Sequence, residues 1–191
     1  MKFDNLGLPQ DMGASDLQDS ARLAGIMSVF NWPQKVPLQL YVISKGKYVR
    51  HPREIKYTFS RDQSICLLAG LNFQKLEILA DPNYKTEGDF VSPSVRGHFK
   101  RCAGLKANWF QDLWLSAEIY FNAHFTPMNE PNQLICMLMV HPDKKYLKLW
   151  TDKNIFWSRA IRDYWEGWRQ EPELSELMIK EIDKIINNQS R

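Results

Sequence analysis

SRDQSICLLAGL, residues 60–71, contains a complete helix start followed by an apolar run. Ser60 is a typical N-cap residue, and Gln63, three positions later, can return a hydrogen bond to it, so that the two form a capping box. Apolar residues then recur at helical spacing from Ile65 onward. The pattern therefore predicts a buried helix that begins directly after Ser60.

Two other stretches resemble this one, QDSARLAGI at residues 18–26 and FQDLWLSAEI at residues 110–119. Each opens a predicted buried helix with an aspartate that is followed by small and apolar residues. If the three are structural repeats, their helices lie side by side with their acidic starts at one end of the domain, as the inner helices of an (α/α) toroid do. The alternative is chance similarity, because capped buried helices share this order of residues.

The rest of the chain is also mainly helical by pattern, with six to seven helices in all, arranged as a bundle or a partial (α/α) toroid. We expect one domain over residues 1–191, in which residues 1–14 form an N-terminal arm. A β-hairpin or extended element is expected near residues 39–49. Further helices are predicted by caps and apolar periodicity at residues 16–30, 94–102 (capped by Ser92), 109–125 (capped by Asn108), 132–140, 152–168 and from 172 onward. The short apolar run at 132–140 would alternatively form a central strand. The helix after Asn108 is apolar around nearly its whole circumference, which predicts that it is buried.

Composition describes a globular protein, since 44% of the 191 residues are hydrophobic and 25% are charged. The net charge of +3 is mild and no long run of like charge occurs, so a nucleic-acid partner is not expected. The three cysteines, Cys66, Cys102 and Cys136, are odd in number and far apart, which argues against a disulfide framework or a zinc site. No signal peptide and no membrane-spanning apolar run are visible, and a cytoplasmic protein is expected.

Carboxylates at helix starts are the first candidate site residues. Asp62 and Glu118 are the predicted acid/base pair of a hydrolase, with Asp19 and Asp112 in the same pocket, because paired carboxylates divide acid and base roles in glycosidases. Glu118 stands in the middle of LWLSAEIYF, where it would otherwise be a buried charge. The simpler interpretation is that helix-start aspartates interact with the helix dipole and free N–H groups, and that Glu118 pairs with an arginine.

A basic group precedes the opening stretch. Arg50 and Arg61 can hold an anionic substrate, and His51, which titrates near neutral pH, is the third predicted catalytic residue. The alternative is a salt-bridge network that ties this loop to the aspartates.

Asn122 and His124 are candidate contacts for a hydroxyl-rich ligand at a pocket rim, or else part of a surface turn. No metal site is expected, because Glu118 and His124 lack the i, i+4 spacing of a helical zinc site. P-loop, dinucleotide, nucleophile-elbow and HExxH motifs are absent from the sequence, and no cofactor is expected.

At QDSARLAG, KYVRHP, FSRDQ, SPSVRGHFKRCAG and AHFTPMNEPNQLICMLM the sequence resembles a family of bacterial and phage-encoded proteins that has no assigned activity. The resemblance implies an origin in a bacterial or phage-infected cell and carries no functional residue over. Helix order and acidic helix starts also resemble those of (α/α) toroid enzymes that act on polysaccharides, although a closed double ring normally has more helices than this chain.

Two functions are therefore compared. The leading hypothesis is a glycan-directed protein, such as a polysaccharide or cell-wall glycoside hydrolase with a carbohydrate ligand. The alternative is a non-catalytic phage structural or host-interaction protein that binds a protein partner through an aromatic stripe, made of Phe156, Trp157, Tyr164, Trp165 and Trp168. An enzyme should gather its carboxylates and His51 in one pocket, whereas a binding module should expose a continuous apolar patch.

Overall fold

The described part of the chain is mainly helical. A computed structural model describes residues 2–10, 20–29, 40–42, 47–53, 61–79, 92–125, 136–137, 140, 180 and 184. Its helices within these ranges are α1 (Ser20–Val29), α2 (Arg61–Phe73), α3 (Pro93–Cys102) and α4 (Trp109–Phe125). The helix predicted at residues 152–168, and most of those predicted at 132–140 and from 172 onward, lie outside these ranges. The predicted total of six to seven helices and the toroid therefore stay predictions.

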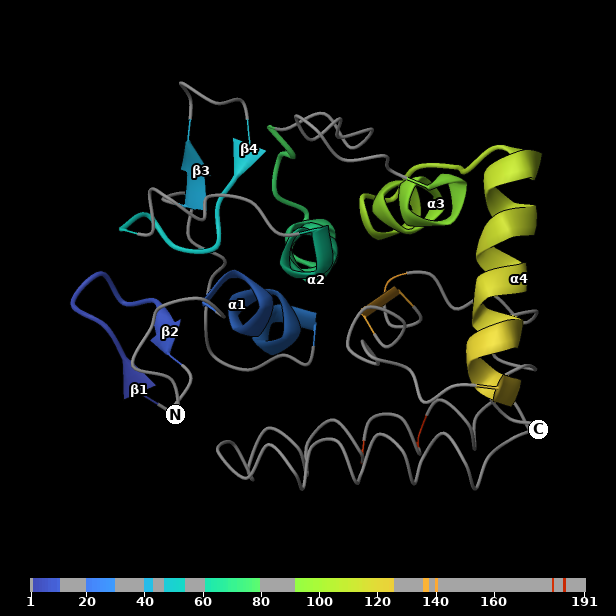
Figure 1. The fold of residues 1–191 in the computed structure, drawn as a ribbon. Helices are drawn as coiled ribbons and strands as arrows, with labels where there is room; N and C mark the ends of the chain where they lie inside the picture. Colours follow the sequence, from blue (N-terminus) through green and yellow to red (C-terminus); the bar gives the residue numbers. More distant parts are fainter. Residues whose placement is uncertain are drawn as a thin grey trace.

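Within the described ranges, two short antiparallel ladders accompany the helices (Figure 1). β1 (Lys2–Phe3) pairs with β2 (Pro9–Gln10) in the N-terminal arm, with Lys2 opposite Gln10. β3 (Tyr41–Val42) pairs with β4 (Lys47–Tyr48), inside the range where the sequence predicts a hairpin. Val49 continues this pairing by donating its N–H to the Leu40 carbonyl. The second ladder leads the chain directly to His51.

α1 and α2 form the tightest contact in the described fold. All ten residues of α1 are buried. A Cβ atom on Gly25 would lie 2.2 Å from the carbonyl oxygen of Cys66, and one on Gly70 would lie 2.9 Å from the Cα of Gly25. The two backbones therefore approach closely only because both positions are glycine. These glycines end the Leu-Ala-Gly sequences that α1 and α2 share.

The same contacts fix the relative direction of the two helices. Gly25 lies against Cys66 and Gly70, and further along α1 the Cβ of Ser28 lies near Gly70. The Gln74 side-chain amide, just beyond α2, donates to the Ser28 hydroxyl over 3.2 Å. Contact positions advance together along both helices, so α1 and α2 run in the same direction. Their N-termini lie at the same end of the pair, as the repeat hypothesis expects.

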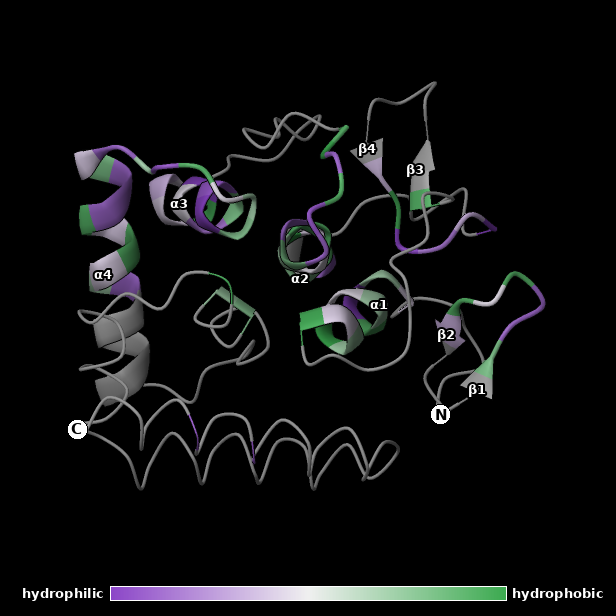
Figure 2. Cartoon of the chain, turned by 180° about the vertical axis from the view of Figure 1, so that it is seen from behind, coloured by the Kyte–Doolittle hydropathy of each residue, from purple (hydrophilic) through white to green (hydrophobic). Residues whose placement is uncertain are grey.

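α3 lies between α2 and α4, and the view from behind shows the same order (Figure 1, Figure 2). The main neighbour of α4 is therefore α3, so that the third of the similar stretches does not lie beside the first two. α3 begins as predicted, with the Ser92 hydroxyl accepting a hydrogen bond from the Val95 N–H and Pro93 in the first turn. It is followed by Gly104, whose φ of +78° suits glycine. At Gly97, α3 packs against Gln111 and Leu115 of α4.

The N-terminal arm folds around one aspartate. Asp4 Oδ1 accepts the N–H groups of Leu6 and Leu8, each over 2.8 Å, and the Asp4 carbonyl accepts the N–H of Gly7. Gly7 has a φ of +76°, which a residue with a Cβ adopts only with strain. The turn brings Leu8 into full burial, so that the arm is attached by an apolar side chain as well as by polar contacts.

The prediction that the helix after Asn108 is buried all round is wrong for its first half. Four large apolar side chains in this half of α4 are exposed: Trp109 by 77%, Leu113 by 56%, Trp114 by 51% and Phe110 by 44%. In contrast, Gln111 and Leu115 are buried against α3. α4 is thus covered on the side that faces α3, while the opposite side of its first turns carries apolar residues at the surface.

Candidate functional site

The buried His51 side chain forms, with Asp4, a cluster that attaches the N-terminal arm. Its Nε2 atom lies 2.7 Å from Oδ2 of Asp4, and the two side chains are 0% and 3% exposed. Its Nδ1 atom accepts the backbone N–H of Arg53 over 3.1 Å. Because Nδ1 accepts, the proton of the neutral ring is on Nε2, which donates to the Asp4 carboxylate. Both ring nitrogens are engaged, so proton transfer by His51 would require one of these bonds to open.

Asp4 is the charged member of this cluster. Burial alone would raise the pKa of the Asp4 carboxyl, but hydrogen bonds from the Leu8 N–H, His51 and the Leu6 N–H outweigh it, and the pKa is lowered. The carboxylate is therefore ionised in the folded arm at neutral pH. A second contact joins the same segments, since the guanidinium Nη2 of Arg53 donates to Oδ1 of Asn5.

Other predicted residues lie near this cluster along the backbone. The Arg50 carbonyl accepts the N–H of Ala21 over 3.0 Å, which places the 50–53 segment at the N-terminus of α1. Arg61 and Asp62 occupy the first turn of α2. Because α1 and α2 run in the same direction, this turn lies at the same end of the pair. The side chains of Arg61 and Asp62, and the whole of Asp19, lie outside what the structure describes.

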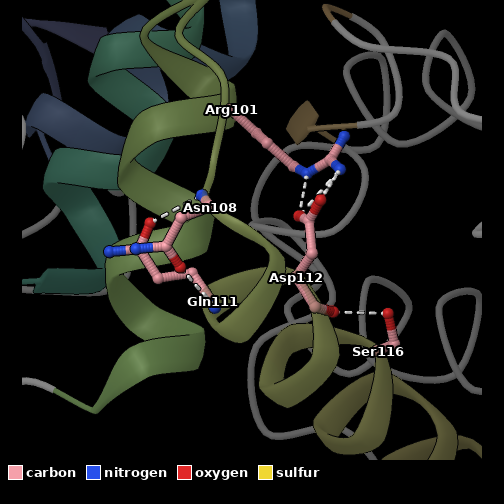
Figure 3. A network of polar contacts seen from close by, with 5 residues as sticks. All are labelled: Arg101, Asn108, Gln111, Asp112 and Ser116. Atoms are coloured by element: carbon pink, nitrogen blue, oxygen red, sulfur yellow. Dashed lines mark hydrogen bonds and ion pairs between the residues drawn. The ribbon is translucent and has the colours of Figure 1, made fainter.

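Asp112 has a defined partner at the start of α4 (Figure 3). Arg101, in the last turn of α3, donates from Nη2 to both carboxylate oxygens of Asp112 over 2.8 Å, and from Nε to Oδ1 over 2.9 Å. This forked geometry is the strongest form of an Arg–carboxylate contact. The contact joins the last turn of α3 to the first turn of α4 and gives Asp112 a partner without a substrate.

The N-cap of α4 is a complete capping box, also drawn in Figure 3. Asn108 Oδ1 accepts the N–H of Gln111 over 2.8 Å, and Gln111 Oε1 accepts the N–H of Asn108 over 3.1 Å. The prediction that Asn108 caps this helix is confirmed. With the Arg101–Asp112 contact one position later, the first turn of α4 is held from two sides.

The remaining candidates are further along α4. Glu118 is partly exposed rather than buried, so the sequence argument from a buried charge does not apply to it. Asn122 and His124 lie in the last two turns of the helix, and their side chains lie outside the described atoms. Glu118 and Asp62 belong to helices that α3 separates (Figure 1). Among the described residues, no group of three or more His, Cys, Asp or Glu side chains could hold a metal ion.

The exposed side of α4 is a site that the sequence did not predict. We name Trp109, Phe110, Leu113 and Trp114 the aromatic face. Its rings form a continuous edge-to-face chain, with 5.7 Å between the centroids of Trp109 and Phe110 and 6.3 Å between those of Phe110 and Trp114. Such contacts favour one arrangement of the rings. The sequence signal was the density of large apolar residues after Asn108, but it gives no sign of which side a neighbour covers.

No helix among the described residues has the length and apolarity needed to cross a membrane. The aromatic stripe predicted at residues 156–168 lies outside the described ranges. Comparisons of the chain with models of protein families, with curated proteins and with solved structures found no match. The aromatic face and the His51 cluster are therefore interpreted from their own chemistry.

Proposed function

We propose that this chain is a non-catalytic interaction protein that binds a protein partner through the aromatic face of α4. The observation that carries the proposal is the exposure of two tryptophans, a phenylalanine and a leucine on one side of a single helix. Contiguous exposed apolar surface of this kind marks interaction sites on soluble proteins. Tryptophan is also among the residue types that dominate binding energy at interfaces.

The support beneath the aromatic face also favours binding. The capping box of Asn108 and Gln111 and the ion pair of Arg101 and Asp112 hold the first turn of α4. The edge-to-face contacts order the three rings before any partner arrives. A surface that is already ordered loses less conformational entropy on binding than a mobile one.

The glycan-directed hydrolase predicted from the sequence is the competing proposal, and it requires Asp62 and Glu118 at one sugar ring. Three observations favour the interaction protein over it. Asp112 is engaged by Arg101, His51 uses both ring nitrogens, and α3 lies between the helices of Asp62 and Glu118. The Asp62→Asn and Glu118→Gln variants test the hydrolase directly. The hydrolase proposal is refuted if both folded variants cleave cell wall or polysaccharide as well as the wild type does. It is also refuted if the wild-type protein shows no cleavage.

A photo-crosslinking amino acid at Leu113 tests the interaction protein. We expect crosslinks at position 113 in producing cells, identified by mass spectrometry. We also expect the purified partner to bind saturably, and Trp114→Ala to weaken this binding at least tenfold. Tryptophans at interfaces commonly contribute more than about 1.4 kcal/mol of binding free energy. The matched control is the same amino acid at Lys75, an exposed position that follows α2.

Two outcomes contradict this proposal. One is an absence of crosslinks at position 113 above the level at position 75. The other is a partner whose affinity is the same for the wild type and for Trp114→Ala, with circular dichroism showing that both are folded.

A further inference from the structure

We propose that the partner of the aromatic face is a second copy of this chain, which packs its α4 antiparallel against the first about a two-fold axis. This inference rests on the proposed interaction function and names the occupant of the same surface. Closed symmetric dimers are the most common assemblies of soluble proteins, and their interfaces use the same patch on both copies. The aromatic face must therefore be complementary to itself.

The spacing of the aromatic face meets this requirement. Its four residues are placed symmetrically about a point between positions 111 and 112. Two antiparallel helices related by an axis through that point set Trp109 against Trp114 of the second copy, and Phe110 against Leu113. Each large ring then meets an apolar side chain, with the two tryptophans, which are 77% and 51% exposed, at the two ends. Apolar groups thus oppose one another along the whole face.

Charges beyond the face distinguish the antiparallel from the parallel arrangement. Lys106, which is exposed, lies three residues before Trp109, and Glu118, which is partly exposed, lies one helical turn after Trp114. In the antiparallel pair, Lys106 of each copy lies at the end where Glu118 of the other copy is found. In a parallel pair, lysine would meet lysine and glutamate would meet glutamate. Charge complementarity therefore favours the antiparallel pair.

Asp112 lies between Phe110 and Leu113 in sequence, but its charge does not oppose this arrangement. Asp112 is engaged by Arg101 of its own chain through a forked contact, so its charge is neutralised where the two helices would meet. Arg101 comes from α3, on the covered side of α4. Neither group has to be desolvated without a partner when the two copies associate.

Sedimentation equilibrium of the full-length chain across a wide concentration range tests the proposal. We expect a reversible monomer–dimer equilibrium, and we expect Leu113→Glu to give a folded monomer. Lys106→Glu or Glu118→Lys alone should raise the dimer dissociation constant about tenfold, because each reversal replaces two attractive pairs with two repulsive ones. The double variant Lys106→Glu/Glu118→Lys should return the dissociation constant to the wild-type value. Matched controls are Lys75→Glu and Glu77→Lys, exposed charges beyond α2.

Each alternative result has a definite meaning. A monomer at every concentration overturns the proposal, as does a dimer that Leu113→Glu leaves intact. Single reversals that weaken the dimer without rescue in the double variant overturn the antiparallel arrangement. Crosslinks from position 113 to a different protein, in a chain that stays monomeric, would refute the second copy while supporting the interaction function. Monomers without any crosslink refute both.

Discussion

His51 and Asp4 join two segments that are 47 positions apart in sequence. Their contact combines a buried imidazole, a carboxylate with a lowered pKa and two backbone N–H donors on the other carboxylate oxygen. The sequence marked His51 as chemically unusual, but its partner was not predictable. Asp4 lies in a glycine-containing arm whose path depends on the burial of Leu8, which is a tertiary effect.

The lowered pKa of Asp4 predicts a pH dependence of stability. A carboxylate whose pKa is lower in the folded than in the unfolded state stabilises the fold above its unfolded value of about 3.9, and this contribution is lost as pH falls through the lower folded value. Asp4→Asn should therefore lower the free energy of unfolding by about 2 kcal/mol at pH 7. The difference from wild type should be complete at pH 7 and should shrink as pH falls through the unfolded value towards the lower folded value. Urea unfolding across this range measures it, and a difference that is constant with pH would contradict the charged role of Asp4.

Arg101 and Asp112 form a pair whose energy a double-mutant cycle can isolate. Their side chains are 13% and 29% exposed, so solvent screening keeps the contact moderate despite its forked geometry. We expect a coupling free energy of about 1 kcal/mol between Arg101→Gln and Asp112→Asn in urea unfolding. It should fall when the salt concentration is raised. Zero coupling at low salt would show that the pair does not link α3 to α4.

At the scale of single elements, caps were predictable from sequence and exposure was not. Ser92 and Asn108 were identified correctly because an N-cap is set by a side chain and the N–H groups two or three residues later. The exposure of Trp109 depends instead on which helix lies beside α4, and sequence spacing carries no such information. For the same reason, the sequence argument wrongly treated Glu118 as a buried charge.

The two caps allow a matched experiment on α4. Asn108→Ala and Ser92→Ala should each lower the free energy of unfolding by about 1 kcal/mol, since each removes a side-chain cap. Only Asn108→Ala frays the turn that carries Trp109 and Phe110, so only this variant should weaken association through the aromatic face. The measurement pairs urea unfolding with the dimer dissociation constant. Equal weakening by both variants would show that global stability, and not the order of the first turn of α4, controls association.

At the scale of the whole molecule, the main feature of the described fold is the close approach of α1 and α2. The sequence indicated that their starting segments resemble each other, and the structure places the two helices side by side in the same direction. What the pattern did not reveal is that Gly25 and Gly70 meet. From the sequence, a glycine within a helical pattern is expected only to lower the stability of that helix. Its role in packing becomes visible only when the partner helix is in place.

Gly25→Ala tests this contact. The added methyl group would overlap the Cys66 carbonyl, a backbone atom that cannot move away alone, so we expect a loss of about 3 kcal/mol or more. The matched variant is Gly97→Ala in α3, whose Cβ would lie 3.2 Å from the Gln111 carbonyl oxygen. There the gain of about 1 kcal/mol in helix propensity offsets mild crowding, and the net change should be small. Equal stability of the two variants in urea unfolding would contradict the close approach of α1 and α2.

The shared direction of α1 and α2 also has a consequence for how the chain is made. Ser28 and Gln74 bond across 46 positions, so the two helices cannot form as a local helical hairpin. Ribosomes release α1 first, and the buried residues that α1 packs against α2 stay uncovered on that side until α2 has emerged. Closing so long a segment is slower than closing a short one. A nascent chain that ends before residue 61 should therefore leave α1 open to chaperones, whereas one that extends past residue 79 can bury it.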